Sequence, residues 1–130
     1  MKYLLLLSFC FLFLQGKAQD SDSSNEPDSI KKTVLATYYH RKFEGRRTTS
    51  GAKYRSKKLT AAHRTLPFGT LITVTNPDNG KSVVVKVNDR GPFSKRLAID
   101  LSERAAKQIG IYSKGIAKVS LSYTVEWYSF

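Results

Sequence analysis

Short runs of aliphatic and β-branched residues, separated by turns that contain glycine or proline, recur from residue 34 to residue 125. Residues 71–75 and 82–87 flank the segment NPDNG at residues 76–80. This arrangement predicts a β-hairpin, because Asn-Gly accommodates the positive φ of a tight turn. Residues 116–125 alternate apolar and polar side chains with a period of two, which is typical of a strand with one solvated face. The pattern as a whole favours an all-β domain.

Residues 34–39 predict a further strand at the start of this domain, and one short helix is expected near residue 105. Asp100 is a candidate N-cap with Glu103 three residues later, as in a capping box, and Gly110 is a candidate helix end. Three apolar residues are expected on one face of this helix: Leu101, Ala105 and Ile109. Short strands, tight turns and one or two short helices predict a small closed β-barrel around one modest core.

The first residues of the chain have the features of an export signal. Lys2 precedes an apolar run at residues 3–14, and the small residues Gly16 and Ala18 follow it. This layout predicts a secretory signal peptide over residues 1–18, because the run is too short to span a bilayer comfortably. The alternative is a buried helix or a short membrane anchor. Cys10 lies inside this run. Because it is the single cysteine of the sequence, an internal disulfide is excluded.

The net charge belongs to the domain. Residues 19–32 are polar, rich in serine and aspartate and without periodicity, which predicts a disordered linker ahead of a domain over residues 33–130. The whole chain carries 22 Lys+Arg against 10 Asp+Glu, a formal net charge of +12. From residue 33 onward the count is 18 against 6, so this part alone carries +12.

A charge of this size favours an anionic partner such as nucleic acid, anionic lipid or an acidic wall polymer. The predicted export disfavours nucleic acid, and the absence of cysteine after residue 18 disfavours a disulfide-stapled extracellular domain. We therefore expect a protein secreted across the inner membrane into the periplasm or envelope of a bacterium, without a stable membrane span. A monomer is expected.

Few residues are candidates for chemistry. His40 and His63 are the only histidines, and they have no ligand spacing, so we predict neither a metal site nor a cofactor. Asp89 follows an apolar strand in the segment VNDRGPF. It is either a turn residue that bonds nearby amides or a partly desolvated general acid with a raised pKa. For Asp100 a helix cap is the simpler role, and His63 alone reads as a polar group at a strand end.

An ordered set of segments across the domain resembles the rare-lipoprotein-A (RlpA-like) family. The segments are ATYY at 36–39, GRRT at 45–48, TSG at 49–51, LTAAHRTLPFGT at 59–70, VTN at 74–76, NGKSVVV at 79–85, VNDRGPF at 87–93, IDLS at 99–102 and AA at 105–106. The resemblance implies a six-stranded double-psi β-barrel. It also implies an endolytic enzyme that cuts peptidoglycan glycan strands without water and leaves 1,6-anhydro-N-acetylmuramyl ends.

The resemblance assigns roles residue by residue. The family's catalytic aspartate matches Asp89, and its active-site histidine matches His63. The family's active-site glutamate lies eleven residues before that histidine, where this chain has Ala52. Four residues are candidate contacts for the glycan: Tyr38, Tyr39, Arg90 and Phe93. Because the sugar's own 6-hydroxyl attacks in a non-hydrolytic cleavage, Asp89 alone is expected to act first as acid and then as base.

Two classes of function stay open because of Ala52. One is a transglycosylase that uses Asp89, and the other is a non-catalytic peptidoglycan-binding or wall-loosening module of the expansin kind. Glu44 is the one nearby acid that would stand in for the missing glutamate. A nucleic-acid binder, suggested by basic residues among aromatics, is disfavoured by the signal peptide.

Overall fold

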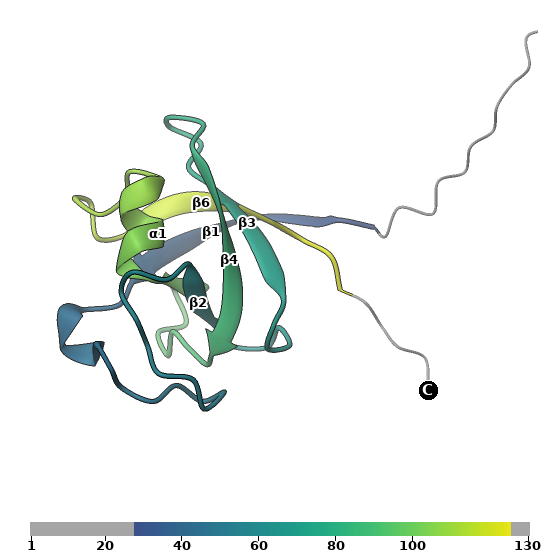
Figure 1. Ribbon diagram of the computed structural model, residues 1–130. Coiled ribbons are helices and arrows are strands. Elements are labelled where there is room, and N and C mark those ends of the chain that lie inside the picture. The colour runs from purple at the N-terminus through teal and green to yellow at the C-terminus, as the bar shows by residue number, and fades with distance from the viewer. Residues whose placement is uncertain (1–27, 126–130) are drawn as a thin grey trace, which may run out of the picture.

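The computed structural model describes residues 28–125, which form a closed barrel (Figure 1). The predicted signal peptide and residues 19–27 of the predicted linker lie outside the described residues. The elements follow in the order β1 (Ile30–Tyr38), a 3₁₀ turn η1 (Arg41–Phe43), β2 (Thr60–His63), β3 (Leu71–Thr75), β4 (Ser82–Asp89), β5 (Ile99–Leu101), α1 (Glu103–Gln108) and β6 (Ala117–Tyr123). Among the described residues no helix is long and apolar enough to cross a membrane.

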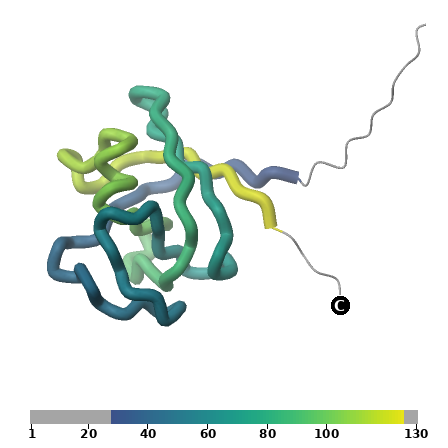
Figure 2. The backbone as a smooth tube through the Cα atoms, viewed as in Figure 1, coloured from purple at the N-terminus to yellow at the C-terminus, as the bar shows by residue number. Residues whose placement is uncertain are grey.

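The six strands close in the order β1-β5-β2-β4-β3-β6. Two of the strand pairs, β1 with β5 and β2 with β4, are parallel, and the other four are antiparallel. The connection from β1 to β2, residues 39–59, makes a wide excursion on the side of the barrel away from the two described chain ends (Figure 2). The closed barrel expected from the strand pattern is confirmed.

The barrel interior is aliphatic, as the alternation in the strands requires. In β4 the residues pointing inward are buried while Ser82, Val84 and Lys86 are exposed. The same alternation holds in β6. The largest fully buried aliphatic side chains of this core are Ile72, Val74, Val85, Val87, Ile99, Leu101, Ile109, Ile111, Val119 and Leu121.

The hairpin prediction is confirmed. Strands β3 and β4 pair from Leu71 with Lys86 to Thr75 with Ser82, and Gly80 in the turn has φ 72°. The side chains of Asn76 and Asn79 donate to the backbone carbonyl of Ile109 at 2.9 and 3.0 Å, which ties the turn to the end of α1. Gly110 follows that helix with φ 77°, as expected of a residue that ends a helix.

Two local predictions are wrong. Strand β1 begins at Ile30, because residues 30–32 pair with residues 121–123 of β6, so the last three residues of the predicted linker belong to the barrel. The N-cap of α1 is Ser102, whose side chain accepts from the Ala105 amide at 3.3 Å. Asp100 lies instead inside β5, where it pairs with its neighbours on both sides and has no helix to cap.

Candidate active site

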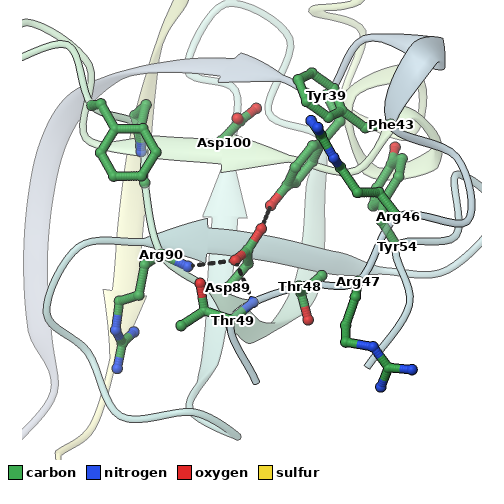
Figure 3. A pocket seen from close by; sticks show the side chains of 13 residues that line it. Tyr39, Phe43, Arg46, Arg47, Thr48, Thr49, Tyr54, Asp89, Arg90 and Asp100 are labelled. Carbon is green, nitrogen blue, oxygen red and sulfur yellow. Dashed lines mark hydrogen bonds between the residues drawn. The ribbon is translucent and has the colours of Figure 1, made fainter. Parts of the chain in front are cut away.

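Two carboxylates from different strands lie on the outer face of the barrel, on either side of one small residue. Ala62 in β2 pairs with Asp89 in β4 on one side and with Asp100 in β5 on the other. Paired residues of neighbouring strands project from the same face of a sheet, so both carboxylates flank Ala62. Ala62 itself is buried and packs in a small cluster with Tyr39 and Tyr54. Asp89 and Asp100 both line one hollow, shown in Figure 3.

A β-bulge aims Asp89 at this hollow. Ala61 pairs with Val87 and Ala62 pairs with Asp89, so Asn88 is an extra residue on β4. Val87 points into the barrel core, and without the extra residue strict alternation would turn Asp89 inward as well. The bulge places it outside, which is the common use of such irregularities next to functional sites.

Asp89 is held by three hydrogen bonds. The Tyr39 hydroxyl donates to Oδ2 at 2.5 Å, and the amides of Thr49 and Arg90 donate to Oδ1 at 2.9 and 2.8 Å (Figure 3). Burial alone raises the pKa of Asp89, but the hydrogen bond from Tyr39 and those from the two amides outweigh it and lower the pKa below its usual value. The expectation of a raised pKa at Asp89 is therefore wrong, because donors surround its carboxylate.

Asp100 is the residue whose ionised form is disfavoured. Its Oδ1 atom is buried and has no hydrogen-bond partner among the described residues. Burial, and after it the negative charge of Asp89, raises the pKa of Asp100 to about 7. Near neutral pH the site thus holds one fixed anion and one carboxyl group that readily carries a proton. Sequence reasoning missed this role because the local pattern around Asp100 resembled a helix cap.

Aromatic rings form one wall of the hollow. Tyr39 stacks on Tyr54 with ring centroids 4.3 Å apart and meets Phe43 edge-on at 5.9 Å. Tyr54 is almost fully buried, and its hydroxyl accepts from the Glu103 amide at 3.1 Å. Burial, and after it the hydrogen bond to Asp89, raises the pKa of Tyr39, so this hydroxyl stays a donor. The ring cluster therefore fixes the donor that holds Asp89.

The mouth of the hollow is basic and aromatic. Its volume is about 330 Å³, and its rim includes Arg46, Arg47, Pro92 and Phe93. The Arg46 guanidinium lies 5.4 Å from the centroid of the Phe43 ring, and Arg47 donates to the Gly51 carbonyl at 3.0 Å. The Phe93 ring is 89% exposed. The aromatic residues of such a rim suit the apolar faces of sugar rings, and its arginines suit negative charge on the same ligand.

Two predicted site residues lie outside this hollow. His63 ends β2, and its Nδ1 accepts from the amides of Thr65 and Leu66 at 3.2 and 3.1 Å. Burial, and after it the charges of nearby arginines, lowers the pKa of His63, so its ring is neutral near pH 7. Tyr38 stacks on Tyr112 at 4.6 Å and donates to the Tyr112 carbonyl at 2.8 Å. Neither side chain lines the hollow.

Arg90 lines the hollow, but its guanidinium serves the fold. It donates to the carbonyls of His63 and Leu66 at 3.1 and 2.8 Å and lies 4.0 Å from the centroid of the Phe68 ring. Its backbone amide, in contrast, donates to Asp89. Of the predicted contact residues, the structure brings Tyr39, Phe93 and the backbone of Arg90 together with Asp89.

Within the part of the chain that the structure describes, no carboxylate fills the place of the family's glutamate. The Ala52 carbonyl accepts from the amide and the hydroxyl of Thr48 at 2.7 and 2.6 Å. Glu44 accepts from the Ser56 amide at 2.7 Å and does not line the hollow, so it does not stand in for the missing group. Among residues 28–125 no three His, Cys, Asp or Glu side chains are grouped so as to hold a metal ion.

The sequence profile of the lytic transglycolase family matches residues 31–121, from the beginning of β1 into β6. The chain belongs to the lytic transglycolase family. Two curated relatives are similar to it. They are the endolytic peptidoglycan transglycosylase RlpA of Haemophilus influenzae, 50% identical over 83% of this chain, and the probable endolytic peptidoglycan transglycosylase RlpA of Synechocystis sp., 55% identical over 69%. The chain spans only 38% and 28% of these relatives' lengths.

Among solved structures, this lytic transglycolase domain is similar to an expansin of Clavibacter michiganensis. The TM-score is 0.60 at 22% identity, over 77% of this chain and 53% of the expansin. At that identity the likeness speaks for the fold alone. It agrees with the closed six-stranded barrel, and the double-psi β-barrel implied by the sequence resemblance is confirmed.

Proposed function

We propose that this protein cleaves peptidoglycan glycan strands endolytically and without water, leaving 1,6-anhydro-N-acetylmuramyl ends. The observation that carries the proposal is the carboxylate pair, Asp89 and Asp100, on either side of Ala62 in a hollow with aromatic and basic walls. The relatives named as peptidoglycan transglycosylases supply the substrate class. Because peptidoglycan lies in the bacterial cell envelope, the proposal requires a cell envelope protein that is exported to the periplasm.

In this proposal Asp100 is the general acid and base. With a pKa of about 7 it carries a proton in much of the protein near neutral pH. The bond between the anomeric carbon and the bridging oxygen breaks as the bridging oxygen takes this proton. The C6 hydroxyl oxygen then bonds to the anomeric carbon and gives its proton to the Asp100 carboxylate. The carboxyl group is regenerated, and no activated water is needed.

Asp89 acts in this proposal as the fixed anion. Three donors satisfy its carboxylate and lower its pKa, which makes it a poor proton donor. A carboxylate held in this way stabilises the positive charge that develops at the anomeric carbon, because it needs no reorganisation during the reaction. This differs from the sequence-based expectation, in which Asp89 moved the proton itself.

The other side chains then have supporting roles. The rings of Phe93, which is exposed, and of Tyr39 can stack against the sugar rings. Arg46 can pair with acidic groups on the glycan strand. His63 is a positioning residue, since it bonds the turn whose carbonyl at Leu66 receives Arg90, the residue next to Asp89.

Digestion of purified sacculi tests the proposal. We expect the wild-type protein to release anhydro-muropeptides and the Asp100→Asn variant to release them roughly 10²–10⁴ times more slowly. Asp78→Asn is a matched control, because Asp78 is an exposed carboxylate that pairs with Lys114 away from the hollow. This control should keep wild-type turnover.

The second candidate is a non-catalytic peptidoglycan-binding or wall-loosening module. The observation in its favour is Ala52, where the family's glutamate is missing and no other acid replaces it. Sedimentation of the wild-type protein with sacculi, without any anhydro product, would overturn the enzyme and leave this module.

A further inference from the structure

The β1–β2 connection concentrates the positive charge of the domain. Residues 41–58 contain eight Lys or Arg and one acid, Glu44. One side of the connection contributes Arg46 and Arg47 to the rim of the active-site hollow. The other side faces α1 through Ser56, whose carbonyl accepts from the Arg104 amide at 3.0 Å. The connection therefore separates the active-site hollow from a second region beside α1.

That second region is hollowed and basic. A surface hollow of about 470 Å³ is lined by Ser56, Lys57, Glu103, Arg104 and Lys107, and we call it the α1 hollow. A smaller neighbour of about 300 Å³ shares Ser56 and Glu103 with it and adds Arg41 and Glu44. The Arg104 guanidinium also donates to the Lys57 carbonyl at 3.1 Å, in addition to the backbone bond from the Arg104 amide to Ser56 that holds the connection against the helix.

The acids of this region leave the α1 hollow with a surplus of positive charge. The Glu103 side chain is only 11% exposed and is shared by Lys107 at 2.8 Å and Arg41 at 3.4 Å. Among the described residues no carboxylate lies within ion-pair distance of Lys57 or Arg104, and both residues are exposed.

Glu44 does not offset that surplus. Its carboxylate already accepts from the Ser56 amide at 2.7 Å and lies 3.7 Å from the Arg55 guanidinium. The hydrogen bond from Ser56 and the charge of Arg55 lower the pKa of Glu44 and outweigh the opposing effect of burial, so the carboxylate stays ionised and engaged with these partners. Two cations of the α1 hollow, Lys57 and Arg104, therefore face solvent ready for carboxylates from outside.

We propose that the α1 hollow binds the free carboxylates of peptides that hang from peptidoglycan strands, on the side of the β1–β2 connection opposite the carboxylate pair. The inference rests on the proposed substrate and deepens it. Charge complementarity selects this occupant, because wall peptides carry free carboxylates and the hollow presents unpaired cations. The α1 hollow would then hold the domain on the wall by a contact that takes no part in bond cleavage.

Binding to two preparations of sacculi tests this proposal. The double variant Lys57→Gln/Arg104→Gln is compared with Lys86→Gln/Lys118→Gln, which removes the same charge from exposed positions on the barrel strands. We expect the α1-hollow variant to bind intact sacculi about fivefold more weakly, since each exposed ion pair contributes roughly a twofold change in affinity. On sacculi stripped of peptides by an amidase, it should bind as the wild type does.

Measuring glycan turnover alongside binding distinguishes a failure of this proposal from a failure of the proposed enzyme activity. The α1-hollow variant should cleave soluble, peptide-free glycan at the wild-type rate, which also shows that it is folded. Equal weakening by both double variants would overturn the proposal, because the attraction would then be diffuse. Undiminished wild-type binding to stripped sacculi would overturn it as well. Peptide-dependent binding without any anhydro product would overturn the enzyme instead and leave the α1 hollow standing.

Discussion

Replacing Asp89 with asparagine should move the titration of Asp100 toward lower pH. The pKa of Asp100 is raised to about 7 by burial and, after it, by the negative charge of Asp89. Asparagine has the size of aspartate, and its amide oxygen can still accept from the amides of Thr49 and Arg90. The variant therefore removes the charge and keeps the shape of the site.

The size of the effect follows from the strand register. Asp89 and Asp100 lie on either side of Ala62, two strand spacings apart, or about 10 Å between backbones. Two unit charges at that distance repel by about 1.7 kcal/mol at an effective dielectric constant of ~20. Because one pKa unit corresponds to ~1.4 kcal/mol, the midpoint for Asp100 should fall by about one pH unit. The rest of the rise in the pKa of Asp100 is due to burial, which the variant leaves in place.

Carbon-13 NMR of the carboxyl groups, recorded between pH 4 and pH 9, measures the midpoint directly. The Asp78→Asn variant serves as control, because Asp78 pairs with Lys114 at the surface and should leave the Asp100 titration unchanged. If Asp89→Asn leaves the Asp100 midpoint in place or raises it, the two carboxylates are not coupled across Ala62. The assignment of acid and anion to this pair would then fail.

Three further perturbations probe the same site. Tyr39→Phe removes the 2.5 Å hydrogen bond to Asp89, so the pKa of Asp89 should rise in NMR titrations and the free energy of unfolding should fall by about 1.5–3 kcal/mol in urea melts. Asp100 has a raised pKa in the folded state, so the stability linked to its protonation is complete below pH ~4 and lost as the pH rises through about 7. Asp100→Asn should therefore gain up to about 4 kcal/mol over the wild type between pH 4 and pH 8, and equal differences in urea melts at both pH values would contradict this. Glu44→Gln should leave glycan turnover within about twofold, because its carboxylate bonds Ser56 and does not line the hollow, and a loss like that of Asp100→Asn would show that Glu44 replaces the missing glutamate after all.

Features with a local physical signal could be predicted from the sequence. The Asn-Gly turn and the alternation on both sides of it set β3 and the start of β4, because turn geometry and pleat are properties of neighbouring residues. Gly110 ends α1 for the same kind of reason. The family resemblance added the barrel topology and pointed to Asp89.

The chemistry of the site depends on pairing between distant strands, which no local pattern records. Strand β5 has three residues, too few for a periodicity, so the sequence around Asp100 predicts a capping box instead of a strand. The bulge at Asn88 arises only when β4 meets β2. The donors around Asp89 come from Tyr39 and Thr49 in the distant β1–β2 connection as well as from Arg90, which is why the pKa of Asp89 is lowered and not raised as expected.

The carboxylate pair sits on strands, while most of the rim sits on the β1–β2 connection. Each carboxylate is held through its own strand's hydrogen bonds to β2, and a closed barrel has no free edge along which these strands can slide. Evolution can therefore change the basic rim residues of the connection, such as Arg46 and Arg47, without disturbing the spacing of the two carboxylates, as long as Tyr39 and the Thr49 amide still hold Asp89. Exchanging these rim residues for those of a related protein is accordingly a direct way to change which polymer is held while keeping the same acid pair.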